Sequence, residues 1–571
     1  MAEYTSFEVK YEFEDLGLDT GTFTINDNSS IASGSLIDGT DFQKVITGEH
    51  NFSILDGSCA ELTSSNECAY FNTTRSTSAG TYTTSPYIDI SFLDFHKSYG
   101  LTLYFSETAP TKIKVTWYHN SIVLLAKEIE LDPAELIAYV RQVMESFNRV
   151  KIEFLEGVPD RYIKLNKVEF GSSIVWDETI IKTGTIVKGL NRISDMLSID
   201  TLTFTLVDDT NSMNYANPNN LQSIFQRDQA MYPVEILDGV RVPLGKFFLD
   251  TFSYEANVGT ISAYSYMGLL DKIPYNNGTI YNNVYASTVL QDIFAVAGIT
   301  DYTISSAIGN MRLYGTIAPK SCREALSDVL FACQGIIDTS DPSNVRVAKA
   351  SGIINSPILR SNKIKTKVVE NDPVSGVAVT YTTYTLESEA TEIFKDTYSA
   401  GTHEVILKSP YSNYSISGAT LVSSTTYTVK FTCVSDAEVT LTGKPYEETT
   451  RTYTVNSSLS RGQTVNVVEH STKLCNVDTV KTLANSLLDY YKNNLSIEVQ
   501  HYASDASLDG SHTIENPVTS LPDFLGVYEE RTIDLTGGFL DSAKMVGYFD
   551  TSDNFYYTGT ELYCNEDVGL I

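Results

Sequence analysis

The sequence predicts a mainly β, multidomain protein, and three observations lead to that fold class. The chain has 571 residues, more than a single hydrophobic core usually holds, so several domains are expected. Short runs in which apolar and polar residues alternate recur along most of it, as in residues 201–207, and this is the period of a half-buried strand. Helical periodicity is concentrated in residues 271–355 and 477–491. The pattern therefore predicts a jelly-roll-like β-sandwich, two β-barrels flanking a small α/β unit, and an inserted β module.

Residues 1–173 form the predicted sandwich, because short alternating runs and turn-rich pieces follow one another at even spacing. One helix is expected inside it. Asp132 can cap this helix and Pro133 suits its first turn. The apolar residues that follow share one helical face: Leu136, Val140, Val143 and Phe147. Two further strands are expected on either side of a turn at residues 158–160.

Sandwiches of this kind include sugar-binding lectin domains, so exposed aromatic residues are candidates for a glycan site. Trp117 and Tyr118 are a first aromatic pair, and the favoured interpretation is that Trp117 fills the core together with aromatic residues at alternate positions. Tyr70 and Phe71 stand in a polar stretch and are the better candidates for glycan binding.

The first barrel is expected at residues 174–270, where two strand-like regions are separated by a long polar segment, residues 208–232. We call this segment the polar excursion. The α/β unit follows at residues 271–355. A helix is predicted at residues 288–297, with Thr288 and Gln291 as its capping box and Gly298 at its end. A second helix opens with a capping box of Ser321 and Glu324 and stops at Gly335, and a strand at residues 344–348 completes the unit.

The second barrel is expected in two pieces, residues 356–399 and 471–571, because strand patterns of similar type lie on both sides of a compact β-rich segment. That segment, residues 400–470, is the predicted inserted module. A helix at residues 477–491 follows it.

Composition and motifs argue against an enzyme. The formal net charge of −31 disfavours phosphate-rich partners, so no sequence-specific nucleic-acid binding is expected. No Walker sequence, G-x-G-x-x-G or G-x-S-x-G is present, and the histidines and cysteines lack metal-ligand spacing. We therefore expect no catalytic residue, no cofactor and no metal site. His501 and His512 could meet across a hairpin, but two solvent-facing strand residues are the favoured interpretation.

The seven cysteines are expected to be free thiols, as in a protein made in a reducing cytoplasm. Only Cys59 and Cys68 are close enough in a loop to pair. Cys322 and Cys333 fall in one predicted helix, too far apart along it to bond. The acidic start MAEYTSFEVKYEFED lacks the apolar segment of a signal peptide.

Several motifs, in this order, resemble the hub proteins of phage tails and of phage-like contractile particles. NRISDMLSIDTLTFTL with VPLGKFFLDTFSYE is similar to the first barrel of such hubs. SCREALSDVLFACQGIIDTSD with NVRVAKA is similar to the helix–strand unit that follows it. NNLSIEVQHYASDASLDGSHTIEN with TGGFLDSAKMVGY resembles the second barrel. The N-terminal domain, which closes with PDRYIKLNKVEFG, resembles a sandwich on tail proteins of phages of Gram-positive bacteria.

The resemblance implies a structural baseplate or tail-tip hub in the virion tail, made in the host cytoplasm. It implies a homotrimer whose paired barrels form a ring of pseudo-six-fold symmetry, which adapts a six-fold tail tube to a three-fold spike or tip. The implied partners are the tail tube or distal tail protein, the spike or tip protein and the tape measure protein. The polar excursion is the part expected to touch a neighbouring subunit or the tube, and its candidate residues are Asn214, Tyr215, Phe225 and Gln226.

A receptor-binding tail protein is the alternative. In that interpretation the sandwich binds a host cell-wall glycan through Tyr70 and Phe71.

Overall fold

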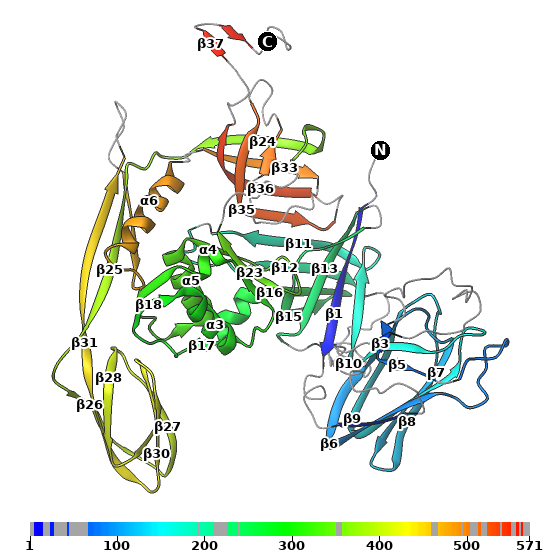
Figure 1. The fold of residues 1–571 in the computed structure, drawn as a ribbon. Helices are drawn as coiled ribbons and strands as arrows, with labels where there is room; N and C mark the ends of the chain where they lie inside the picture. The colour runs from blue at the N-terminus through cyan, green and yellow to red at the C-terminus, as the bar shows by residue number, and fades with distance from the viewer. Residues whose placement is uncertain are drawn as a thin grey trace. The chain divides into compact units, whose positions relative to one another are not determined.

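The computed structural model confirms the mainly β, multidomain fold class (Figure 1). It describes residues 5–14, 23–27, 43–44, 67–72, 74–191, 193–208, 225, 227–237, 240–349, 357–457, 466–492, 495–502, 512–515, 522–536, 540–549, 556–558 and 561–563. The chain divides into two compact units. We call residues 10–175 with 221–230 the sandwich unit, and residues 1–9, 176–220 and 231–571 the barrel unit.

The strands of the first 177 residues are, in chain order, β1 (Thr5–Glu14), β2 (Phe23–Asp27), β3 (Gln43–Lys44), β4 (Glu67–Cys68), β5 (Tyr70–Phe71), β6 (Tyr87–Phe105), β7 (Lys112–His119), β8 (Ile122–Glu130), β9 (Ile137–Glu156) and β10 (Lys164–Asp177). The long strands β6 and β9 pair along two separate stretches, with register shifts between them. One stretch is flanked by β2 and β7, and the other by β10. Trp117 is fully buried in the core that forms between them, as the favoured interpretation predicts.

The helix predicted after Pro133 is wrong, because β9 begins at Ile137 and pairs with β6. Asp132 does accept a hydrogen bond from a backbone amide, that of Ala134, at 2.9 Å. The same bond forms in a simple turn, so the capping signal is real but is not followed by a helix. Several apolar positions of this segment fit both the period of a strand and the period of a helix. The segment is a strand because it pairs with β6.

The barrel unit contains two antiparallel sheets. The first has β11 (Ile181–Gly189), β12 (Thr201–Val207), β13 (Ala230–Leu237), β14 (Val240–Pro243), β15 (Phe247–Glu255) and β16 (Val258–Ser265). The second has β24 (Lys363–Glu370), β33 (Leu495–Tyr502), β34 (His512–Ile514), β35 (Phe524–Asp534) and β36 (Leu540–Phe549). A short hairpin of β37 (Tyr556–Thr558) and β38 (Glu561–Tyr563) follows.

The α/β unit lies between these sheets in the sequence. Its helices are α2 (Tyr266–Lys272), α3 (Ala286–Ala297), α4 (Ser306–Gly309) and α5 (Cys322–Cys333). Its short strands are β17 (Pro274–Tyr275), β18 (Tyr281–Tyr285), β19 (Tyr302–Ile304), β20 (Arg312–Gly315), β21 (Lys320–Ser321), β22 (Gly335–Asp338) and β23 (Val345–Lys349). The later helix α6 (Thr479–Tyr491) contributes Val480, Leu483 and Leu487 to the same core as α3 and α5.

The inserted module is larger than the sequence predicts. It comprises β25 (Gly376–Leu386), β26 (Thr391–Tyr398), β27 (Gly401–Ile406), β28 (Tyr411–Ser417), β29 (Thr420–Ser424), β30 (Thr428–Cys433), β31 (Ala437–Asn456) and β32 (Val467–Thr472). The sequence assigns residues 376–386 to the second barrel, but this strand pairs with β31 and β32. Its inward side chains Val377 and Val379 join the core of α6 instead of the second sheet.

The predicted helix caps are confirmed for α5 and only in part for α3. Ser321 and Glu324 form the predicted capping box of α5. Helix α3 ends at Gly298 in the left-handed conformation, as predicted, but its cap residue is Tyr285, so Thr288 lies inside the helix and caps nothing. In the described part of the chain, no helix is both long enough and apolar enough to cross a membrane. Cys68, Cys322, Cys333, Cys433 and Cys475 are free and buried.

We expect Ser321→Ala to lower the free energy of unfolding by about 1 kcal/mol, because the hydroxyl that accepts from the Glu324 amide is lost. Thr288→Ala is the matched control and should change it by less than about 0.5 kcal/mol. Urea denaturation, followed through hydrogen exchange of the peptides that cover α3 and α5, measures both. Equal effects of the two substitutions would contradict the capping assignment.

Candidate functional site

Among the described strands of the barrel unit, the two sheets are joined by the pairing of β11 with β35. These strands are antiparallel, and their register runs from Thr185 opposite Asp534 to Gly189 opposite Glu530. Backbone hydrogen bonds continue on both sides of this stretch, from Leu535 to Gly184 at 2.8 Å and from Leu190 to Glu529 at 2.9 Å. Because β11 also pairs with β12 and β35 also pairs with β36, the two sheets form one continuous hydrogen-bonded surface (Figure 1).

Charged side chains are buried at this joint. Lys188 on β11 lies opposite Arg531 on β35, and their exposed fractions are 4% and 3%. Two cations facing each other across a strand pair destabilise it unless anions lie nearby. Asp200, Glu235 and Asp541 supply that negative charge, and Glu235 and Asp541 are fully buried. We call these five residues the joint cluster.

Arg531 is held by Asp541 on the adjacent strand β36. Its Nε and Nη2 both donate to Asp541 Oδ2, at 3.0 and 2.6 Å. Burial is the largest single influence on the pKa of Arg531 and lowers it, but Asp541, Tyr528 and Glu235 together outweigh burial, so the pKa is raised. Removing either partner would leave the other as an unpaired buried charge, which costs about 3–5 kcal/mol.

Lys188 and Asp200 are the second part of the joint cluster. Burial lowers the pKa of Lys188, while the Asp200 carboxylate acts in the opposite direction. Burial also raises the pKa of Asp200 to about 6, although Lys188 and a hydrogen bond from the Gly189 amide at 3.0 Å favour its charged form. The Lys188 Nζ donates to Ser340 Oγ at 3.4 Å, which connects the joint to the α/β unit.

Glu235 on β13 is the least satisfied member of the joint cluster. Among the described residues, neither of its carboxylate oxygens has a hydrogen-bond partner. Burial, followed by the negative charge of Asp541, raises its pKa to about 7, and Arg531 offsets part of this increase. Glu235 therefore changes its protonation state near neutral pH.

His501 and His512, expected to face solvent, are both fully buried in the second sheet. The Nδ1 of His501 lies 2.6 Å from its neighbour's carbonyl oxygen, that of Tyr502, so this nitrogen carries the proton. Burial lowers the pKa of His501, with Asp541 acting against this decrease. The ring of His512 packs 4.6 Å from that of Tyr528.

The joint cluster has the chemistry of a structural element. Four of its five members are buried, and its cations and carboxylates mostly neutralise one another. Within the described residues, no three His, Cys, Asp or Glu side chains are grouped so that they could hold a metal ion.

The joint cluster is not among the predicted sites, although the sequence carries a signal for it. Three of its members occupy strand positions whose alternate neighbours are buried and apolar: Lys188 follows Ile186, Glu235 stands four residues after Met231, and Asp541 precedes Ala543. A charge at the apolar phase of an alternating strand therefore indicates a buried charge that needs a partner.

Glu235→Gln should make the chain less sensitive to pH. The pKa of Glu235 rises from its ordinary value of 4.5 to about 7 on folding. Between these values the folded chain keeps a proton that the unfolded chain releases, so the free energy of unfolding falls as pH increases through this window. At pH 8 the substitution should stabilise the barrel unit by about 3 kcal/mol, and near pH 4 the difference should vanish.

Chemical denaturation of both proteins at pH 4, 6 and 8 checks this, with hydrogen exchange of β11 and β35 as the local readout. A stabilisation that is equal at all three pH values would show that the ionisation of Glu235 is not the cause.

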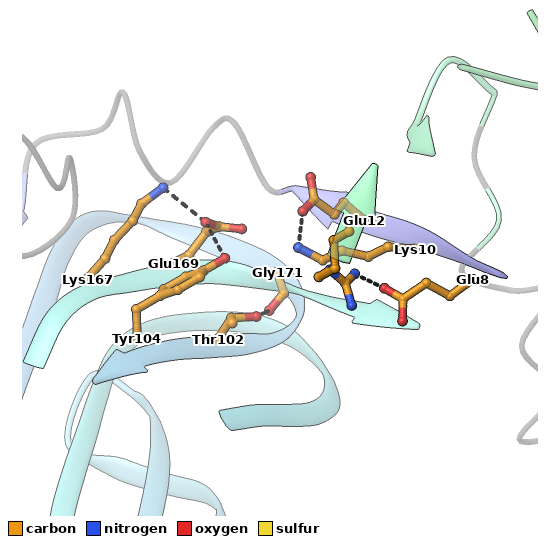
Figure 2. A network of polar contacts seen from close by, with 9 residues as sticks. Glu8, Lys10, Glu12, Thr102, Tyr104, Lys167, Glu169 and Gly171 are labelled. Atoms are coloured by element: carbon orange, nitrogen blue, oxygen red, sulfur yellow. Dashed lines mark hydrogen bonds and ion pairs between the residues drawn. The ribbon is translucent and has the colours of Figure 1, made fainter. Parts of the chain in front are cut away.

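The sandwich unit has a smaller polar network on the strands β6 and β10. Figure 2 shows Tyr104 and Lys167 both directed at Glu169. Their Oη and Nζ donate to the same Glu169 oxygen at 3.1 and 3.0 Å. Burial and then Glu169 raise the pKa of Tyr104, so its hydroxyl stays protonated. This network links neighbouring strands and has no catalytic geometry.

The structure separates the two predicted glycan-binding residues. Tyr70 is fully buried, and its ring lies 5.9 Å from that of Phe154 in the sandwich core. Phe71 is only half-buried and packs 4.9 Å from Tyr162. The expectation of a surface contact is therefore wrong for Tyr70, because alternation along β5 turns it inward, and it stays a prediction for Phe71.

The predicted assembly residues are only partly described. Asn214, Tyr215 and Gln226 lie outside the described residues. Phe225 packs edge-on against Tyr11 within the sandwich unit, with ring centroids 5.3 Å apart. Its role in assembly stays a prediction.

Replacing the two aromatic residues should have different effects. Tyr70→Ala removes a core ring and should destabilise the sandwich unit by about 3–5 kcal/mol. Phe71→Ala should cost about 1 kcal/mol, because its ring is half-exposed. Thermal unfolding monitored through hydrogen exchange of β5 and β10 compares them. A larger loss for Phe71→Ala would contradict the burial of Tyr70.

Solved tail proteins are among the structures to which the chain is similar. No protein-family model matches the chain, and neither does any curated protein sequence. A tail protein from Neisseria meningitidis MC58 is 9% identical, with a TM-score of 0.40, covering 64% of this chain and 92% of that one. The 43 kDa tail protein of prophage MuSo2 from Shewanella oneidensis is 10% identical, with a TM-score of 0.38 and coverages of 66% and 96%. The prophage tail protein gp18 from Listeria monocytogenes EGD-e is 8% identical, with a TM-score of 0.37 and coverages of 66% and 93%.

Proposed function

We propose that this chain is a structural hub of a phage tail or of a phage-like tail, located in the baseplate or tail tip of the virion. In this role three copies form a ring that adapts a six-fold tube to a three-fold spike or tip. Its neighbours are the tail tube or distal tail protein on one side and the spike or tip protein on the other, with the tape measure protein as a further partner. The mechanism is binding geometry, and no chemical step is involved.

The observation that carries the proposal is the joined pair of sheets in the barrel unit. Pairing of β11 with β35 makes both sheets one continuous hydrogen-bonded element. Three copies would then supply six sheets in a closed arrangement, which is the number needed to match a six-fold partner with a three-fold one. The motif order that resembles tail hubs supports the same proposal.

The polar face of the second sheet has features suited to a contact with a neighbour. It is hollowed into a groove of about 400 Å³, lined by Lys365, Lys367, Glu498, Val499, Gln500, Glu530, Thr532, Ser542, Ala543 and Lys544. Lys367 is paired with Glu498 at 3.1 Å and Lys544 with Glu529 at 2.7 Å, so Lys365 is the lysine of this groove that has no ion pair among the described residues. An acidic surface of a neighbouring copy would be attracted to it. The net negative charge of the chain suits a ring lumen through which DNA slides without binding.

We expect the purified chain to have the mass of a trimer in light scattering at micromolar concentration, or to be trimeric in imaged tails. Lys365→Glu should weaken association by about tenfold at low salt, because it reverses a charge in the groove. Lys408→Glu, on an exposed residue of the inserted module, is the matched control and should have no effect. A chain that is monomeric both alone and in the particle would refute the proposal.

A further inference from the structure

One edge of the sandwich unit carries an unusual strand. Among the described strands, β8 pairs with β7 alone, so no described strand covers its other edge (Figure 1). Exposed sheet edges are usually protected by charges or proline, since they otherwise recruit other strands. Here the edge begins with three consecutive apolar residues, Ile122, Val123 and Leu124, whose exposed fractions are 65%, 54% and 40%. This strand is therefore unprotected along its first third.

A second free edge lies close to the first. The beginning of β9, residues 137–141, pairs with β6 on one side, whereas β7 pairs only with the later part of β9. A groove of about 370 Å³ lies between this segment and the end of β8. It is lined by Lys127, Ile129, Glu130, Leu131, Asp132, Glu135, Ile137, Ala138, Tyr139 and Val140.

The groove combines an apolar floor with an acidic rim. Ile129 and Leu131 are partly buried against the sandwich core, and Ala138 and Val140 are buried within it. Three carboxylates on the rim, Glu130, Asp132 and Glu135, outnumber the single lysine. Glu130 remains 80% exposed although it lies 3.6 Å from Lys112, so most of its charge faces outward.

We propose that this groove is a docking site for an extended segment of a partner protein, which adds to β8 as a further strand. Backbone groups along the outer edge of β8 would pair with the segment, and apolar side chains at alternate positions would cover Ile129, Leu131 and the exposed residues at the start of the strand. Lysine or arginine between them would face the acidic rim. A segment of nine residues matches the full length of β8.

The chemistry of the groove favours such a partner over two other occupants, a second copy of this chain and a glycan. A second copy of this chain has 71 acidic against 40 basic residues, so most of its surface would match the acidic rim less well than a basic segment does. A glycan gains its affinity from an exposed aromatic platform, and the only aromatic residue that lines this groove in the described part of the chain is Tyr139. An apolar and basic strand fits both the floor and the rim.

The test uses the full chain and a capped nine-residue peptide with valine at alternate positions and lysine between them. Fluorescence anisotropy gives its dissociation constant, and hydrogen-exchange mass spectrometry shows where it binds. We expect slower exchange at residues 122–130 and 137–141. The same peptide with glutamate in place of lysine, or with a central proline that cannot pair, should bind at least about tenfold more weakly.

Two protein variants locate the effect. Glu130→Lys should weaken binding of the lysine peptide by about tenfold. Glu438→Lys is the matched control, since Glu438 is also an exposed strand residue paired with a lysine, Lys395, at 3.0 Å, and it should bind as the unmodified chain does. Melting curves of both variants confirm that they fold.

Four outcomes would overturn the proposal. The first is binding of the lysine peptide without slower exchange in β8, and the second is equal binding of the glutamate peptide. The third is protection of this edge by cell-wall oligosaccharides when no peptide protects it. The fourth is protection of β8 in the concentrated chain alone, together with a doubled mass, which would assign the groove to a second copy.

Discussion

The pairing of β11 with β35 is the interaction on which the barrel unit depends. It connects segments more than 300 residues apart in the sequence, and every strand of the second sheet reaches the first sheet through it. The inserted module and the α/β unit are both placed between these two segments in the chain. These two insertions do not interrupt the sheet, because β11 and β35 pair directly although the insertions separate them in sequence.

The buried charges at this joint specify its register. An apolar joint of the same shape would tolerate a shifted pairing, whereas a shift here would separate Arg531 from Asp541 and leave both charges unpaired. Desolvation makes the cluster expensive, as the raised pKa values of Asp200 and Glu235 indicate. The stability of the joint therefore comes from strand pairing and apolar burial, and the charges restrict which pairing is allowed.

Local signals in the sequence predict local structure well in this chain. The capping box at Ser321 and the alternation in residues 201–207 are read correctly, because they depend on neighbours within a few positions. The capping box predicted at Thr288 failed locally, because α3 begins two residues earlier, whereas the failed strand assignments depend on distant contacts. Pairing with β6 turns the segment after Pro133 into a strand, and pairing with β31 takes residues 376–386 away from the second sheet. The joint cluster escaped notice because its members come from four strands and one loop, and only the fold brings them together.

The long strand β31 has a consequence for how this chain can change during evolution. In its first half, Val439 and Leu441 point inward and belong to the core of the inserted module. In its second half, Tyr453 and Val455 point inward and pack against the core of the helices. All four are odd-numbered positions on one uninterrupted backbone. Loss or gain of a single residue between the two pairs would therefore turn one of these sets outward. Length changes in this strand are tolerable only in steps of two residues, or where a bulge absorbs the extra one.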